Sequence, residues 1–112
     1  MQSDPINLDE LKTLYGEDSV RELLDMSLKE ARGLINGLKD SVPRKDASAV
    51  GQDAHQLKGM SATMTMNRVA DLSYKLEQCA KANSWAESQS LLQNIESSFV
   101  ELEEYLKKTL VL

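Results

Sequence analysis

The sequence predicts an all-α protein: an antiparallel four-helix bundle with a short additional helix that caps its N-terminal end. Apolar residues recur at helical spacing along the chain, and no segment alternates between apolar and polar residues as a strand would. Both prolines fall between the periodic segments. The 112 residues suffice for one modest hydrophobic core, so we expect a single domain over residues 1–112.

The first two helices are expected at residues 8–15 and 19–41. Asn7 is a suitable N-cap for the first helix, and Gly16 lies just past its end. The second helix carries its apolar side chains on one face. It has to end before Pro43, because a proline disfavours helical backbone at the residue that precedes it.

Three further helices are expected at residues 46–64, 66–83 and 85–110. The third places small or apolar side chains on one face, at Val50, Ala54, Leu57, Ser61 and Met64. Short connections between four long amphipathic helices favour antiparallel neighbours, and the short first helix is expected to cover one end of the bundle.

Charge and composition exclude several classes of function. A net charge of −5 argues against binding to nucleic acid, which requires clustered Lys and Arg, and against an anionic membrane surface. The sequence has no apolar run long enough to cross a bilayer and no signal peptide at its start. The only cysteine, Cys79, has no partner for a disulfide, which fits a reducing compartment. We therefore expect a cytoplasmic, monomeric protein with protein partners.

The only histidine, His55, falls on the solvent side of the third helix. At 100° per residue it lies roughly 140° from the apolar stripe. Gly51, Gly59 and Ala62 share this face, and Lys58 follows His55 by three residues, slightly to one side. Each glycine costs a helix about 1 kcal/mol relative to Ala. Two glycines beside a histidine therefore indicate a place where a partner approaches closely.

Phosphoryl transfer is the chemistry that fits this group of residues. A neutral imidazole is a nitrogen nucleophile, and a phosphoryl group on its ring needs open space for in-line attack and a cation for its oxygens. Lys58 is able to supply the cation. The sequence has no carboxylate cluster around His55 to hold Mg²⁺ and no second histidine for a metal site, so a partner must bring the metal.

The run from His55 to Ala62, HQLKGMSA, resembles the signature of the histidine-containing phosphotransfer (HPt) domain family, which is His-x-x-Lys-Gly followed by small residues. The stretch 64–72 and the pair Leu76-Glu77 look like the family's continuation into the next helix. The resemblance covers about 30 residues by motif and the whole chain by helix layout. One departure is Thr65, where the family often has Gly; Thr is able to serve there as an N-cap.

The resemblance implies that His55 is the phosphorylated residue and that Lys58 compensates the charge of the phosphoryl group. Gly59, with Gly51 and Ala62, would form the docking surface. The expected partners are receiver domains of response regulators or of hybrid histidine kinases, which would supply Mg²⁺ during transfer. The chain would be a phosphocarrier without ATP-dependent kinase activity of its own, since it has no nucleotide-binding domain.

Several alternatives stay open. The chain could be a helical adaptor that binds receivers without being phosphorylated, or the C-terminal HPt domain of a hybrid histidine kinase. A kinase dimerisation helix pair is disfavoured, because such helices usually have an acidic residue after the histidine and this chain has Gln56. Gly51 could equally be a tolerated weak point near a helix start. Gly33 and Gly37, on the polar side of the second helix, indicate either part of a docking groove or weak packing.

Overall fold

The computed structural model describes residues 4–110 and shows five α-helices in this part of the chain, with no strand. They are α1 (Leu8–Tyr15), α2 (Glu17–Ser41), α3 (Ala47–Thr63), α4 (Asn67–Lys81) and α5 (Trp85–Leu110). The all-helical fold class is confirmed. All five predicted helices have boundaries within two residues of those observed, and the largest differences are at the start of α2 and at the end of α4.

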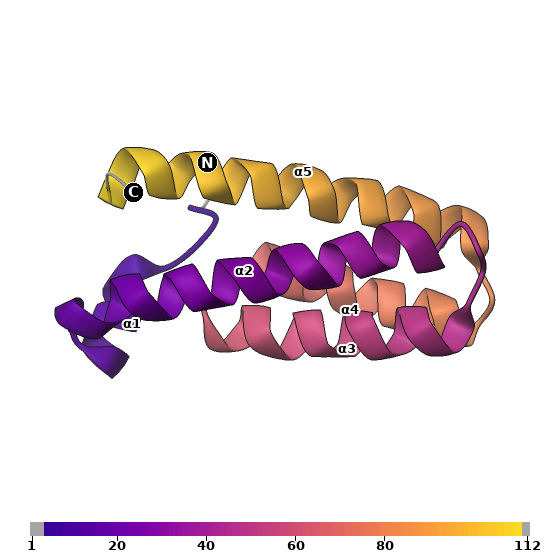
Figure 1. Ribbon diagram of the computed structural model, residues 1–112, viewed down its shortest axis with the longest axis horizontal. Helices are drawn as coiled ribbons and strands as arrows, with labels where there is room; N and C mark the ends of the chain where they lie inside the picture. Colours follow the sequence, from indigo (N-terminus) through magenta and orange to yellow (C-terminus); the bar gives the residue numbers. More distant parts are fainter. Residues whose placement is uncertain (1–3, 111–112) are drawn as a thin grey trace.

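The four long helices form an elongated bundle with principal extents of 42 × 27 × 19 Å. Helix α3 packs between α2 and α4, while α5 packs against α4 and α2. In Figure 1, α2 and α3 run side by side, and the short α1 lies at the end of the bundle where α2 begins. Helix α1 contacts α2, so it caps one end as predicted.

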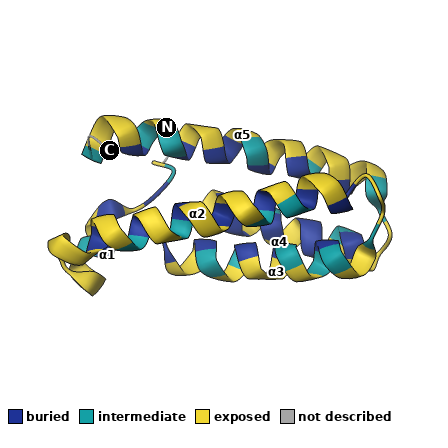
Figure 2. Cartoon of the chain, viewed as in Figure 1, coloured by how far each residue is buried: buried dark blue, intermediate teal, exposed yellow. Residues whose placement is uncertain are grey.

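The core is built almost entirely from aliphatic side chains on the inward faces of the helices (Figure 2). Each fully buried Leu or Ile contributes about 1.5–3 kcal/mol of transfer free energy, so the apolar stripes hold the bundle together. The largest fully buried side chains include Leu11 of α1, Leu24 and Leu38 of α2, Leu57 of α3, Leu76 of α4, and Leu92, Ile95, Leu102 and Leu106 of α5.

Gly16 explains why α2 begins earlier than predicted. It ends α1, where its N–H donates to the Lys12 carbonyl, and it also stands at the N-cap position of α2. Its φ of +83° is accessible to glycine at little cost, so the chain passes from α1 into α2 through a single residue and no linker up to Ser19 is needed. Asn7 caps α1 as predicted, because its side chain accepts from the Glu10 N–H at 3.0 Å.

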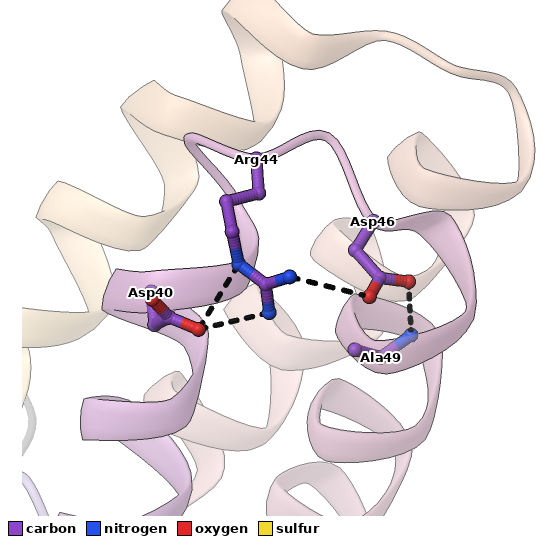
Figure 3. Close-up of polar contacts among 4 residues, drawn as sticks. All are labelled: Asp40, Arg44, Asp46 and Ala49. Atoms are coloured by element: carbon purple, nitrogen blue, oxygen red, sulfur yellow. Dashed lines mark hydrogen bonds and ion pairs between the residues drawn. The ribbon is translucent and has the colours of Figure 1, made fainter.

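The connection from α2 to α3 fixes where the third helix starts. Arg44 bonds Asp40 at the end of α2 through two nitrogens, at 3.1 and 2.8 Å, and reaches Asp46 at 4.0 Å (Figure 3). Asp46 in turn accepts from the Ala49 N–H at 3.1 Å and so caps α3. This cap fixes where α3 begins, while the buried stripe of Val50, Ala54, Leu57 and Ser61 sets which face of the helix carries His55 to the outside.

Thr65 does not serve as an N-cap, so that prediction is wrong. It follows α3 in the left-handed region, with φ of +59°, and it ends this helix in a Schellman motif: Thr65 N–H bonds the Ala62 carbonyl and Met66 N–H bonds the Ser61 carbonyl. Such a position favours glycine. The buried Thr65 hydroxyl bonds both the N–H and the carbonyl of Asn7, at 3.0 and 3.1 Å, which offsets the strain of a β-branched residue there.

Candidate functional site

His55 lies near the middle of α3, on the side of the helix that the apolar spacing indicated. Its side chain is 66% exposed, whereas the opposite face of the helix is buried through Val50, Ala54, Leu57 and Ser61. The imidazole is therefore open to a second molecule and is carried by a helix that the core holds rigidly.

One hydrogen bond holds the exposed imidazole in place. His55 Nδ1 lies 3.1 Å from Oε2 of Glu77, a residue of α4 whose side chain is only 12% exposed. An ionised carboxylate only accepts hydrogen bonds, so this contact assigns the proton of a neutral imidazole to Nδ1. The lone pair is then on Nε2, the nitrogen farther from Glu77. The ring is thus oriented by a buried acceptor and keeps its other nitrogen free to react.

Glu77 is the functional residue that sequence reasoning missed. In the sequence, Glu77 stands out only through the pair Leu76-Glu77, which resembles the family's continuation into the next helix. Its position could have been found from the hairpin formed by α3 and α4, because His55 and Glu77 are equally far in sequence from Met66 at the turn. Residues at equal distances from the turn of an antiparallel helix pair lie at the same level along it, and the rotation of the two helices decides whether they face each other.

Two lysines lie near this pair. Lys58, one turn after His55, is half-buried, and its Nζ lies 5.1 Å from the centre of the Tyr74 ring on α4. Lys81, one turn after Glu77, lies 3.9 Å from Glu77 Oε2. Helices α3 and α4 therefore place one lysine on each side of the His55–Glu77 pair along the helix axes: Lys58 toward the turn at Met66, and Lys81 away from it.

The predicted docking residues border open space. A Cβ atom added at Gly51 or at Gly59 would meet nothing within 4 Å. Gly59 and Ala62 are exposed, and Gly51 is half-buried. The surface beside His55 is thus low and unobstructed, which suits close approach by another protein.

The two glycines of α2 have different surroundings. Gly33 is exposed and open, but a Cβ at Gly37 would lie 2.7 Å from Oδ2 of Asp53 on α3. Close packing of α2 against α3 therefore accounts for Gly37, and the expectation of weak packing is wrong at that position.

The described part of the chain lacks the features of two other classes of site. Across residues 4–110, His, Cys, Asp and Glu side chains nowhere gather in a group of three or more that could hold a metal ion. No helix in the same range combines the length and apolar character needed to cross a membrane.

Comparison with known proteins agrees with this geometry. The model of the Hpt domain family matches residues 22–109. Histidine-containing phosphotransfer protein 2 of Arabidopsis thaliana is 29% identical over 104 residues, which cover 88% of this chain and 67% of the relative. The crystal structure of histidine-containing phosphotransfer protein B (HptB) from Pseudomonas aeruginosa PAO1 superposes with a TM-score of 0.86 at 23% identity, covering 96% of this chain and 95% of that one.

The structural match and the match to the family model show different things. The structural match shows the fold, which HptB shares over nearly the whole described bundle. The family model spans the helix that carries His55 and the helix that carries Glu77, and it covers well over half of the sequence. From the fold, the arrangement around His55 and this match together, we conclude that the chain belongs to the Hpt domain family.

Proposed function

We propose that this chain carries a phosphoryl group on Nε2 of His55 and passes it between the aspartates of receiver domains in a phosphorelay. The observation that carries the proposal is the exposed imidazole whose Nδ1 is bonded to the buried Glu77, which leaves Nε2 as the nucleophile. Family membership and the open surface at Gly59 support it.

The transfer step requires no proton movement. The Nε2 lone pair of His55 attacks the phosphorus of an aspartyl phosphate, an N–P bond forms, and the P–O bond to the aspartate breaks in line. The aspartate leaves as a carboxylate, and the imidazole keeps its Nδ1 proton and gains positive charge. Glu77 stabilises that charge across the 3.1 Å contact, and the same steps in reverse return the phosphoryl group to a second aspartate.

Lys58 is proposed to compensate the negative charge of the phosphoryl oxygens, and the partner is proposed to supply the other reacting groups. A receiver domain would supply the aspartate and Mg²⁺, and it would dock over Gly51, Gly59 and Ala62. These receivers would belong to response regulators or hybrid histidine kinases. We propose that the chain acts as a monomer in the cytoplasm, where the single thiol of Cys79 stays reduced.

Labelling tests this proposal directly. A receiver domain charged with acetyl phosphate and Mg²⁺ is mixed with the wild-type chain, His55→Ala, or the matched control Gln93→Ala, which changes an exposed residue of α5. The wild type and the control should become labelled, and the label should be acid-labile and alkali-stable, as a phosphoramidate is. His55→Ala should stay unlabelled, and ATP alone should label none of them.

Two outcomes would overturn the assignment. If His55→Ala is labelled to the wild-type level, the phosphorylated residue is not His55. If a panel of charged receivers binds the wild type without labelling it, the chain is a receiver-binding adaptor and not a phosphocarrier.

A further inference from the structure

Two side-chain contacts join α3 and α4 in succession. His55 pairs with Glu77, and one helical turn away Lys58 pairs with Tyr74. Lys58 follows His55 by three residues, and Tyr74 precedes Glu77 by three, so both contacts lie on the same pair of facing helix surfaces. The ring of Tyr74 therefore holds the ammonium on the side of α3 that carries the imidazole.

The Lys58 contact differs in kind from those of the lysines that form ion pairs. Lys29, Lys39 and Lys81 each lie within ion-pair distance of a carboxylate. Within residues 4–110, Lys58 has no such carboxylate, and its Nζ lies 5.1 Å from the centre of the Tyr74 ring. The face of an aromatic ring attracts a cation through its quadrupole and leaves the net charge in place.

This difference bears on phosphoryl transfer. A carboxylate beside Lys58 would neutralise the ammonium and would repel the incoming phosphoryl group. An aromatic face restricts the flexible lysine side chain without neutralising its positive charge. Tyr74 is itself 49% exposed, so Lys58 has only to leave a weak, solvent-accessible contact when phosphoryl oxygens arrive.

We propose that Tyr74 is a positioning residue, which holds the uncompensated charge of Lys58 beside His55 in readiness for the phosphoryl group. This proposal rests on the proposed function of His55. It predicts that the rate of phosphoryl transfer depends on the aromatic ring of Tyr74 and not on its hydroxyl group. A cation–π contact at an exposed site is worth about 0.5–1 kcal/mol, which corresponds to about a two- to five-fold effect on rate.

The first measurement does not depend on any partner. Because Nζ of Lys58 lies over the Tyr74 ring, the protons on the adjacent Cε should show an upfield ring-current shift in NMR spectra. The shift should be lost in Tyr74→Leu, return in Tyr74→Phe, and persist in the matched control Tyr15→Leu, which changes another exposed tyrosine. A Lys58 shift that Tyr74→Leu leaves unaltered would overturn the contact itself.

The second measurement is the rate of phosphoryl transfer from the charged receiver at saturating receiver concentration. Tyr74→Leu should transfer about two- to five-fold more slowly than the wild type, and Tyr74→Phe should rescue the rate. The lifetime of phosphohistidine made with phosphoramidate should shorten in the same variant. In a Lys58→Ala background, exchanging Tyr74 for Leu should have no further effect, because the residue acts through the lysine.

The outcomes separate this proposal from the function on which it rests. Transfer at the wild-type rate in Tyr74→Leu would overturn the positioning role while His55 remains the phosphorylated residue. An equal loss in the Lys58→Ala background would also overturn it, because the ring would then be contacting the receiver directly. If the wild type is never labelled on His55, both proposals fail.

Discussion

The two sides of α3 use polar residues in opposite ways. On the side facing α4, His55 meets the buried Glu77 at 3.1 Å. On the side facing α2, Asp53 packs against Gly37 and forms no hydrogen bond or ion pair within residues 4–110. The first side orients a reactive group, whereas the second makes room for a carboxylate that has lost part of its hydration.

The glycines show the same contrast. Gly59 beside His55 faces open space, while the space at Gly37 is taken by the Asp53 carboxylate. Both are glycines within a helix, and sequence spacing alone does not tell them apart. We interpret the first as a position kept small for a partner, and the second as a position kept small for the protein's own packing.

The largest effect is expected from bulky residues at Gly59. Gly59→Gln and Gly59→Lys should slow transfer by roughly 100-fold, because a long side chain beside the imidazole displaces the approaching receiver. Their melting temperatures should hold or rise, since both residues favour a helix over glycine by up to about 1 kcal/mol. Circular dichroism melts and transfer rates, measured together, check both statements.

Gly33→Gln sharpens this comparison, because Gly33 is also exposed and open but lies on α2. It should gain stability without losing transfer. Full transfer in the two bulky Gly59 variants would show that this glycine does not admit a partner. An equal loss in Gly33→Gln would show that docking depends as much on α2.

A smaller effect is expected from removing the partner of the imidazole. A hydrogen bond to a charged group is worth about 1.5–3 kcal/mol, so Glu77→Ala should slow transfer by roughly tenfold or more. Glu77→Gln, which keeps an acceptor oxygen without the charge, should lie between this variant and the wild type. Nitrogen-15 NMR of His55 should show the proton on Nδ1 in the wild type and a larger share on Nε2 in Glu77→Ala. Unchanged tautomers would exclude a positioning role for Glu77.

The two glycines should also differ when each is replaced by alanine. Gly59→Ala should raise the free energy of unfolding by up to about 1 kcal/mol, because it adds helix propensity in open space. Gly37→Ala should gain less, because its Cβ would lie 2.7 Å from Asp53 Oδ2 and the carboxylate would have to rotate away. Adding Asp53→Ala to Gly37→Ala should restore the gain in the free energy of unfolding that Gly37→Ala alone lacks relative to Gly59→Ala. Chemical denaturation measures all three, and equal gains in the two single variants would contradict the packing role of Gly37.

The smallest effect concerns the charge of Asp53. Burial raises the pKa of this carboxyl above its usual value of 3.8. The folded chain therefore binds this proton more tightly than the unfolded chain, and its stability falls as the pH rises through the folded-state pKa. Asp53→Asn should be slightly more stable than the wild type at pH 7, with the difference vanishing below about pH 3.8. A difference that is constant across this range would exclude desolvation of the charge as its cause.

Much of the fold could be predicted because its determinants are local. Helical spacing of apolar residues, the cap at Asn7 and the stop before Pro43 all act within a turn or two of the chain. The exposed position of His55 follows from the same rule, since the angle between two residues of one helix depends only on their separation. The start of α2 was predicted two residues too late, because Gly16 both ends α1 and stands at the N-cap of α2.

The sequence by itself therefore determined the number and order of the helices in the described chain, the buried face of each helix, and the place of His55, Lys58 and Gly59 on one exposed surface. Only the tertiary structure decided which residues of α4 face them. Glu77 and Tyr74 lie 22 and 16 positions from His55 and Lys58, and their contacts depend on how two helices rotate and slide against each other. The packing of many side chains sets that register, and no local rule contains it.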